Sequence, residues 1–497
     1  MKKIANISKG GDSNQKTAQG KSQILAVQNL QKEYMNLLKE FVAFKTVSTD
    51  LTYKDEMKKA VNWLTQIFKE NGFKVKLLKG KSTNPVVVAQ YALKNALKST
   101  KNNAEKNASV NSTKTAASAK TSASPKNILV YGHYDVQPAQ KSDGWSTDPF
   151  VLTKKGDRLV ARGVVDNKGQ ILAHMVGVFN AIKNGALTTN VTFVIEGNEE
   201  SGNEDLAKLL KENKKELAPD FIIISDGEIV GEHPTLDMSY RGGGNMKVTY
   251  TTSSNDRHSG LYGGAIPNAV LELATLVSKI KSENAISFGE FYTGMIEPSE
   301  EARTQHQKIS NVQNVQKLAD VKTLTTMKNL SAHEQIGLYP TIEVSGFSGG
   351  YVGQGFKNII PGKAEVRLNV RTVHPQKTSE VIKSISNFVR LNTPSHVDVS
   401  VEFEDHGEAI RLDTDHEALS SVKTLLTDVY GREVICKSIG ASIPVVADFQ
   451  SIFKVPMAMV SLCNDDCNMH GVNENFTEKH VVKALNFTNR FWNNLTT

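Results

Sequence analysis

A series of short apolar segments, each followed by acidic residues or a histidine, most constrains how this chain can fold. The segments are rich in Ile, Val and Leu, which predicts buried strands. The segments and the residues that follow them are 128–131 with His133 and Asp135, 159–162 with Asp166, 191–195 with Glu199 and Glu200, 221–224 with Asp226, and 458–462 with His470. Because functional side chains collect at the carboxyl ends of strands in α/β sheets, we expect these residues to converge on one edge.

The positive charge of the chain is concentrated in two polar segments. The chain has 497 residues, enough for two domains, and a formal net charge of +7. Residues 1–25 contain five Lys and one Asp, and residues 94–126 contain seven Lys and one Glu. Neither segment is expected to fold, so the basic charge does not indicate a nucleic-acid partner.

The composition also bears on the membrane and the cellular compartment. No apolar run approaches the roughly 18–20 residues that a membrane-spanning helix needs, so no membrane partner is expected. The N-terminal residues lack the sustained apolar core of a signal peptide. Three cysteines, an odd number in a long chain, argue against a disulfide framework and favour a reducing, cytoplasmic location.

The order of predicted strands and helices indicates an α/β fold with a second domain inserted into the first. Residues 127–239 alternate strand and helix, which predicts a mostly parallel sheet covered on both faces. Residues 246–404 follow the order β-α-β-β-α-β, which is typical of a ferredoxin-like α+β domain. The expected catalytic domain therefore comprises residues 1–239 and 406–497, and residues 240–405 form the inserted domain.

Two parts of the catalytic domain are expected to be disordered. Residues 1–22 are polar, and helical spacing of apolar residues begins only at Ile24. Residues 94–126 consist mostly of Lys, Asn, Ala, Ser and Thr. This segment cannot bury enough apolar surface to offset its ordering entropy, so we expect a mobile insertion between two strands.

The side chains that follow the apolar segments match the ligand preferences of divalent metal ions. Zinc and cobalt bind imidazole nitrogen and carboxylate oxygen and leave a position open for water. Two ions about 3.5–4 Å apart need a bridging carboxylate. The candidate ligands are His133, Asp166, Glu200, Asp226 and His470. Asp135 is placed to orient His133 through its second ring nitrogen, and Glu199, next to a ligand, is placed to act as general base.

Other motifs in the sequence are incomplete. Cys463 and Cys467 with His470 remain an alternative, thiol-rich zinc site, although no second thiol pair accompanies them. His333 and Glu334 begin an H-E-x-x-H motif, but Gly337 occupies the position of the second histidine. No glycine-rich phosphate loop follows a predicted strand, and no G-x-S-x-G nucleophile motif is present.

Several ordered motifs together resemble the M20 family of metallopeptidases. They are GHYDVQP (132–138), DGWSTDPF (143–150), ARGVVDNKG (161–169), EGNEESG (196–202), SD (225–226), DRHSG (256–260) and MHGVN (469–473). The resemblance covers nearly the whole chain apart from the N-terminus and residues 94–126. DVQP, the tryptophan and DPF resemble the dipeptidase branch related to carnosinases more than the N-acyl deacylase branch.

The resemblance implies a role for each site residue. One ion would be bound by His133, Asp166 and Asp226, and the other by Asp166, Glu200 and His470. Asp166 would bridge the ions, next to a cis peptide bond with Asn167. Glu199 would move the proton, and His258 would polarise the substrate carbonyl. The substrate carboxylate would be anchored by Arg371 and by the turn formed by Gly440, Ala441 and Ser442. Lys437-Ser-Ile-Gly440 departs from the Arg-Glu-Gly-Gly often found in dipeptidases.

The expected function is therefore metal-dependent hydrolysis of dipeptides next to a free C-terminal carboxylate. Two divalent ions are expected, zinc first, with manganese or cobalt as alternatives. The resemblance further implies a homodimer formed through the inserted lid and dimerisation domain. An N-acyl-amino-acid deacylase or desuccinylase of the same family, and a catalytically inactive binding relative, remain the alternative functions.

Overall fold

The computed structural model describes residues 12–93, 125–282, 284–405, 407–441 and 443–494. Residues 94–124, which make up nearly all of the predicted insertion, lie outside the described residues, as does Ser442. No helix of the described part of the chain is long and apolar enough to cross a membrane.

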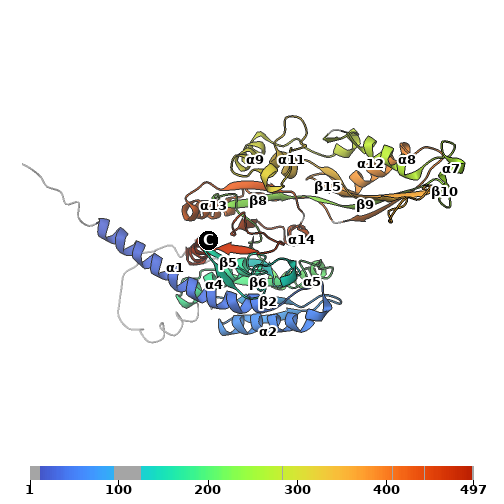
Figure 1. Cartoon of the computed structure of the whole chain (residues 1–497). Coiled ribbons are helices and arrows are strands. Elements are labelled where there is room, and N and C mark those ends of the chain that lie inside the picture. Colours follow the sequence, from blue (N-terminus) through green and yellow to red (C-terminus); the bar gives the residue numbers. More distant parts are fainter. Residues whose placement is uncertain (1–11, 94–124, 283, 406, 442, 495–497) are drawn as a thin grey trace, which may run out of the picture. The chain divides into compact units, whose positions relative to one another are not determined.

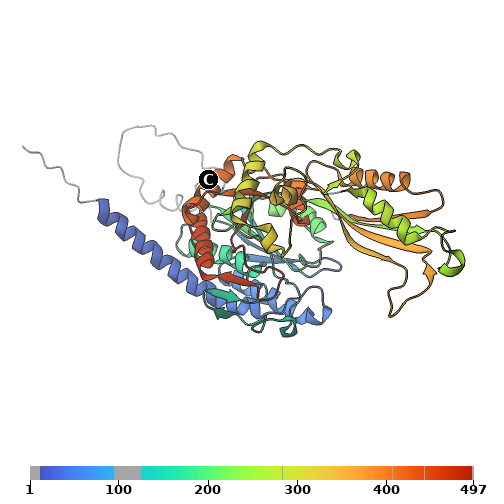
Figure 2. The same ribbon diagram turned by 45° about the horizontal axis from the view of Figure 1, so that its top comes forward.

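The chain divides into two compact units, shown in two views in Figures 1 and 2. Unit 1 comprises residues up to Pro234 together with His416–Glu433 and Ile452–Thr497. Unit 2 comprises Thr235–Asp415 and Val434–Ser451.

Unit 1 is built on a mixed sheet whose central strands are parallel. Within this unit the strand order is β1-β2-β6-β3-β7-β19, and β6, β3, β7 and β19 pair in parallel. The strands are β1 (Lys74–Leu78), β2 (Val86–Tyr91), β3 (Asn127–His133), β6 (Asn190–Glu196), β7 (Phe221–Ile224) and β19 (Met457–Ser461). A separate small sheet contains β4 (Thr153–Lys155), β5 (Arg158–Val160) and β20 (Asn475–Thr477). The predicted α/β class with a largely parallel central sheet is confirmed.

The helices of unit 1 pack around a central buried helix, α4 (Lys168–Lys183). Nearly every residue of α4 is buried, because α1 and α15 both pack against it. Gly177 permits this approach, since a Cβ there would lie 3.0 Å from side-chain atoms of Thr488 and Trp492. The other helices are α1 (Asp12–Ala43), α2 (Lys54–Glu70), α5 (Leu206–Glu212), α6 (Lys214–Leu217), α13 (Glu417–Tyr430) and α15 (Glu478–Asn494).

The N-terminal helix is longer than the sequence pattern predicts. Helix α1 begins at Asp12 rather than at Ile24, and its N-terminal part extends away from the rest of unit 1 in Figures 1 and 2. The structure assigns residues 12–22, which were expected to be disordered, to this helix, and residues 1–11 lie outside the described range. The extension contains Gln, Lys and Ala, which favour helix. Each residue added to an existing helix forms one further main-chain hydrogen bond, so extending a helix is easier than starting one.

Unit 2 contains a four-stranded antiparallel sheet with the strand order β13-β15-β9-β16. Helix α8 follows β9 and helix α12 follows β15, so the connectivity is that of the predicted ferredoxin-like domain. Its elements are β9 (Gly242–Thr251), α8 (Ala269–Ile280), β13 (Thr341–Gly349), β15 (Lys363–Thr372), α12 (Thr378–Leu391) and β16 (Asp398–Asp405). Met246, Val248, Leu273, Val366 and Ile385 are among the buried residues of its core.

A second group of strands in unit 2 explains why Val434–Ser451 belongs to this unit. Strand β8 (Thr235–Tyr240) pairs with β17 (Ile410–Arg411) and, in parallel, with β18 (Ile435–Ile439). This grouping differs from the expected boundary, which assigned all residues after 405 to the catalytic domain. The other elements are β10 (Arg257–His258), α7 (Ser259–Tyr262), β11 (Lys281–Ser282), β12 (Ala285–Ile286), α9 (Glu300–Val312), α10 (Val315–Leu318), α11 (Ala332–Leu338), β14 (Ile359–Ile360) and α14 (Pro444–Phe453).

Candidate metal centre

The parallel strands of unit 1 bring three of the five predicted ligands to one edge of the sheet. The expectation that every ligand follows a strand of this sheet is wrong for Asp166, because the apolar segment before it forms β5 of the separate small sheet. His133 is the last residue of β3, and Asp226 follows β7 by two residues. Glu199 and Glu200 lie just after β6, which is hydrogen-bonded to β3 on the side opposite β7. Because these three strands run in parallel, their carboxyl ends deliver these residues to a common place.

Five carboxylate and imidazole side chains form two groups that share one residue. His133, Asp166 and Asp226 form the first group, and Asp166, Glu200 and His470 form the second. In each group the candidate ligand atoms all lie within 4.8 Å of one another. These groups contain all five of the metal ligands predicted from the sequence.

The carboxylate of Asp166 faces both groups with different oxygens. Its Oδ1 lies 3.0 Å from Nε2 of His133, and its Oδ2 lies 2.7 Å from Nε2 of His470. Nε2 of His133 is also 3.5 Å from Oδ2 of Asp226, and Nε2 of His470 is 3.2 Å from Oε2 of Glu200. This arrangement is the one expected of a carboxylate that bridges two ions.

The electrostatics of both groups favour positive charge at the imidazole nitrogens. Burial lowers the pKa of His133, but the carboxylates of Asp226, Asp135 and Asp166 outweigh burial and raise it well above its usual value. Hydrogen bonds to Asp166 and Glu200 raise the pKa of His470 to about 10. Nε2 of His133 is buried and has no hydrogen-bond partner of suitable geometry in the described structure. A divalent cation would supply both the positive charge and the missing partner, so the residues fit a metal site.

Asp135 is fully buried and links His133 to the loop after β6. Its Oδ1 is 3.4 Å from Nδ1 of His133, and its main-chain oxygen is 3.1 Å from the same nitrogen. Its carboxylate also accepts hydrogen bonds from the main-chain N–H groups of Glu199 and Glu200, at 3.2 and 3.1 Å. Ser48 Oγ donates a further hydrogen bond at 2.7 Å. Asp135 therefore fixes the orientation of the His133 ring.

Asn167 fixes a second ligand. The peptide bond between Asp166 and Asn167 is cis, as the family resemblance implies. The Asn167 amide donates hydrogen bonds to Oδ1 of Asp226 at 2.8 Å and to the main-chain oxygen of Ser225 at 2.6 Å. One oxygen of Asp226 is thereby held while the other, Oδ2, faces His133.

The environment of Glu199 changes its acidity. Burial raises the pKa of its carboxyl to about 8, and the negative charges of Asp226, Asp166 and Glu200 add to that rise, whereas His133 opposes it. A carboxyl group with a pKa near neutral pH is suited to taking up and releasing a proton.

The remaining predicted site residues belong to unit 2. His258, in β10, is exposed, and its Nδ1 accepts a hydrogen bond from the main-chain N–H of Gly260 at 3.0 Å. Arg371, in β15, donates from Nε to Oδ1 of Asn369 at 3.0 Å. Gly440 and Ala441 follow β18, and Ser442 lies outside the described residues. The roles of these residues toward a substrate remain predictions.

The thiol-rich alternative is not formed. Nε2 of His470 faces the carboxylates of Asp166 and Glu200. Cys467 Sγ instead donates to Oε1 of Glu228 at 2.9 Å, and Cys463 Sγ donates to the main-chain oxygen of Gly227 at 3.2 Å. Both thiols are fully buried.

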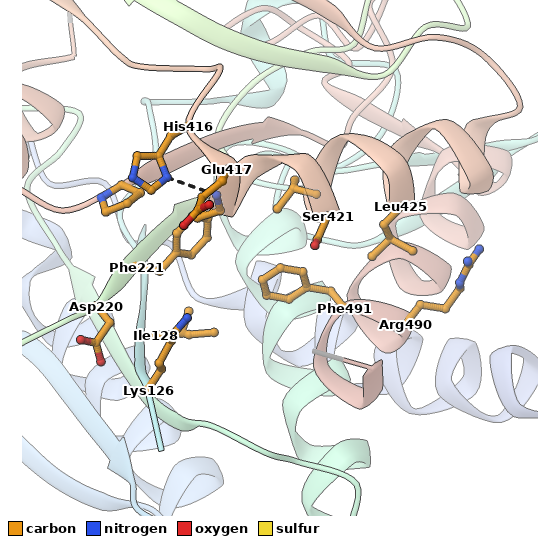
Figure 3. A pocket seen from close by; sticks show the side chains of 13 residues that line it. Lys126, Ile128, Asp220, Phe221, His416, Glu417, Ser421, Leu425, Arg490 and Phe491 are labelled. Atoms are coloured by element: carbon orange, nitrogen blue, oxygen red, sulfur yellow. Dashed lines mark hydrogen bonds between the residues drawn. The ribbon is translucent and has the colours of Figure 1, made fainter. Parts of the chain in front are cut away.

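A cavity of about 600 Å³ in unit 1 is separate from the metal centre. Its lining includes Lys126 and Ile128 at the start of β3, and Phe221 at the start of β7, whereas the ligands lie at the ends of these strands. Figure 3 shows the side chains of α13 and α15, among them Leu425 and Phe491, on its other side. The cavity therefore has no part in the chemistry of the two ligand groups.

Several supporting residues were not predicted from the sequence. Ser48 contacts Asp135, and Gln137 donates to Oε2 of Glu200 at 2.7 Å. Arg162 and Glu474 form a buried ion pair beside Asp166 and His470. Arg162 had a detectable signal, because a charged residue inside the apolar segment 159–165 requires a buried partner.

Three comparisons place the chain among known proteins. A probable di- and tripeptidase of Saccharomyces cerevisiae is 28% identical over 476 residues, which cover 93% of this chain and 50% of the relative, so the chain spans about half the length of that protein. A cysteinylglycine-S-conjugate dipeptidase of Corynebacterium striatum is 31% identical over 366 residues, which cover 72% of this chain and 79% of the relative. The crystal structure of human carnosine dipeptidase 1 shares the fold, with a TM-score of 0.72, 22% identity and coverage of 95% of this chain and 98% of that chain. Residues 129–494 match peptidase family M20/M25/M40, and the chain belongs to this family.

Proposed function

We propose that this chain is a dinuclear metallohydrolase that cleaves dipeptides at the amide bond next to a free C-terminal carboxylate. The observation that carries the proposal is the carboxylate of Asp166, which presents one oxygen to each of two ligand groups. The relatives from Saccharomyces cerevisiae and Corynebacterium striatum are named as peptidases of short substrates, which supports the substrate class.

The proposed cofactor is a pair of divalent ions, with zinc first and manganese or cobalt as alternatives. His133, Asp166 and Asp226 would hold one ion, and Asp166, Glu200 and His470 the other. Mixed imidazole and carboxylate ligands suit zinc. When bound, the ions supply Lewis-acid activation of water and of the substrate carbonyl.

The residues of the chain supply proton transfer and orientation. Glu199, which is next to the candidate ligand Glu200, takes a proton from the attacking water and delivers it to the leaving amine. Asp135 holds the His133 ring through Nδ1, which leaves Nε2 directed at Asp166 and Asp226.

The residues of unit 2 are proposed to act on the substrate. Because Nδ1 of His258 accepts a hydrogen bond, the neutral ring carries its proton on Nε2, where it can be donated to a carbonyl oxygen. Arg371 would pair with the substrate carboxylate, for which the planar guanidinium is suited. Gly440, Ala441 and Ser442 are proposed to complete the carboxylate-binding site.

We further propose a homodimer formed through unit 2 and a cytoplasmic location. Strand β13 is an edge strand of the four-stranded sheet, and Val344 and Phe347 on it are 46% and 43% exposed. Exposed apolar side chains on a sheet edge favour pairing with another chain. The three cysteines are all thiols, which agrees with a reducing compartment.

The test is turnover by the purified protein loaded with Zn²⁺, Mn²⁺ or Co²⁺. The substrates are a panel of dipeptides, the same dipeptides with an amidated C-terminus, and matched N-acyl and N-succinyl amino acids. We expect the free dipeptides to be cleaved fastest and the amidated ones slowly, with activity lost on chelation and restored by metal. Faster cleavage of the acyl amino acids would identify a deacylase, and no turnover by metal-loaded protein would identify a binding relative.

A further inference from the structure

Arg162 and Glu474 form a buried pair of opposite charges beside the metal centre. Nη1 of Arg162 lies 2.8 Å from Oε2 of Glu474, and their side chains are 4% and 0% exposed. The two residues lie far apart in the sequence, on the segment after β5 and on the segment before β20. A buried ion pair costs desolvation free energy, so its presence calls for a role that a well-packed apolar pair would not fulfil.

Glu474 holds the segment that leads to the shared ligand. Its Oε2 accepts hydrogen bonds from Arg162 and from the main-chain N–H of Gly163, the latter at 2.9 Å. Its Oε1 accepts from the main-chain N–H groups of Val165 at 2.9 Å and Asp166 at 3.2 Å. All four partners are N–H donors, so both oxygens act only as acceptors. The carboxylate thereby fixes the backbone of Asp166.

Arg162 holds the segment that carries the other imidazole ligand. Its Nη2 donates to the main-chain oxygens of His470 at 3.1 Å and Gly471 at 3.2 Å. His470 has a φ of 60°, in the left-handed region that non-glycine residues rarely adopt, so its conformation needs such support. The guanidinium also lies over the ring of the buried Trp145, 5.3 Å from its centroid.

We propose that Arg162 and Glu474 act together as positioning residues that set the separation of Asp166 and His470. This inference rests on the proposed metal centre and adds to it the ion pair that holds two residues of the second ligand group, Asp166 and His470, in place. One ion pair joins the main chain of Asp166 to the main chain of His470, and neither charged residue belongs to the two ligand groups. Outer partners of metal ligands change metal affinity by about 10–100-fold when they are removed.

A neighbouring ion pair provides a matched control. Nη2 of Arg158 lies 2.5 Å from Oδ2 of Asp466, and this pair also joins the region of β5 to the segment that carries His470. Its side chains are 35% and 58% exposed, and the guanidinium bonds to Asn475 and Asp466 rather than to the main chain of a predicted ligand. Exposed pairs of this kind contribute little.

The experiment compares Co²⁺ binding by wild type, Glu474→Gln, Arg162→Lys and Arg158→Lys, followed by visible absorption. In Glu474→Gln an amide NH₂ group replaces one of the two carboxylate oxygens. Because both oxygens of Glu474 accept hydrogen bonds from N–H groups, the NH₂ group would face donors in either orientation of the side chain. In Arg162→Lys a single ammonium cannot reach all three oxygens. In Glu474→Gln and Arg162→Lys we expect the dissociation constant of the more weakly bound Co²⁺ ion to rise about 10–100-fold, with an altered absorption band. In Arg158→Lys we expect this constant to change less than about twofold.

Two outcomes separate this inference from the proposed metal centre. If wild type binds fewer than two Co²⁺ ions, the dinuclear proposal fails whatever the variants do. If wild type binds two and both variants keep the wild-type constants and band, the positioning role is overturned. A purely structural role would lower the melting temperature without changing either constant.

If the variants do not fold, a measurement on the wild-type protein still tests the positioning role. Hydrogen exchange is followed in the peptide containing Gly163, Val165 and Asp166, before and after removal of metal by a chelator. Because these amides donate to Glu474 rather than to a ligand of the metal, we expect them to stay protected after chelation. Exchange as fast as that of an exposed loop would overturn the positioning role.

Discussion

Asp135 accepts a hydrogen bond from the main-chain N–H of Glu199, with 3.2 Å between Oδ1 and the nitrogen. The same oxygen lies 3.4 Å from Nδ1 of His133. One buried carboxylate therefore positions both a candidate ligand and the backbone of the candidate base. Its loss should affect metal binding and proton transfer together.

The first prediction concerns this carboxylate. Asp135→Asn should lower metal affinity or turnover by about 10–100-fold, because an amide N–H₂ would face an N–H donor where an oxygen accepts now. The measurement is kcat together with bound metal per chain. Ser48→Ala removes a single donor to Oδ2 and should have a smaller effect. Unchanged values in Asp135→Asn would contradict the orienting role.

The second prediction concerns Glu199. Glu199→Gln should keep its metal content and lower kcat by about 10²–10⁴-fold, the usual contribution of general acid–base catalysis. Glu204→Gln, at an exposed position in the same loop, is the control and should have wild-type kcat. Near-normal turnover of metal-loaded Glu199→Gln would exclude this residue as the base.

The third prediction concerns the pH dependence of stability. Burial lowers the pKa of His174 from 6.5 to about 3, and its Nε2 is 2.9 Å from Oγ of Ser225. Between these pH values the unfolded chain binds a proton that the folded chain does not, so the stabilisation is complete above pH 6.5 and decreases as the pH falls toward 3.

The comparison for His174 is urea unfolding of wild type and His174→Gln at several pH values. The variant has no histidine at this position and therefore lacks this titration. As the pH falls from 6.5 to 5, the unfolding free energy of wild type should decrease by about 2 kcal/mol relative to that of the variant. A difference that stays constant with pH would show that His174 does not remain neutral in the folded protein.

The fourth prediction concerns the proposed homodimer. If His258 acts on the active site of the partner subunit, His258→Ala and Glu199→Gln homodimers should each be nearly inactive. A mixed two-fold dimer would contain one site with intact Glu199 and a donated His258, so equal co-refolding should restore about a quarter of wild-type activity. No recovery from verified mixed dimers would place the action of His258 within its own chain.

The parts of the fold that follow local patterns were predictable. The apolar segments before His133, Glu199 and Asp226 are β3, β6 and β7, because a buried parallel strand requires an uninterrupted apolar run. The same pattern identified the five side chains that form the two ligand groups, although Asp166 and His470 follow β5 and β19 only after six and nine residues.

The supporting contacts could not be predicted in this way. Arg162 and Glu474 are 312 positions apart, and nothing in the residues around Glu474 marks it as a partner. Lys168 is also fully buried, where it donates to the main-chain oxygens of Phe41 and Phe44. Such contacts depend on which loops meet after folding. Likewise, the assignment of Val434–Ser451 to unit 2 depends on the pairing of β18 with β8.

The order of the ligands along the chain has a consequence for synthesis on the ribosome. His133, Asp166 and Asp226 all precede unit 2, whereas His470 follows it. A nascent chain can therefore assemble its first ligand group well before translation reaches the last imidazole. A product that terminates prematurely between Asp226 and His470 would retain four of the five candidate ligands without His470, which completes the second group. We expect such a fragment to be inactive, because its second ligand group is incomplete.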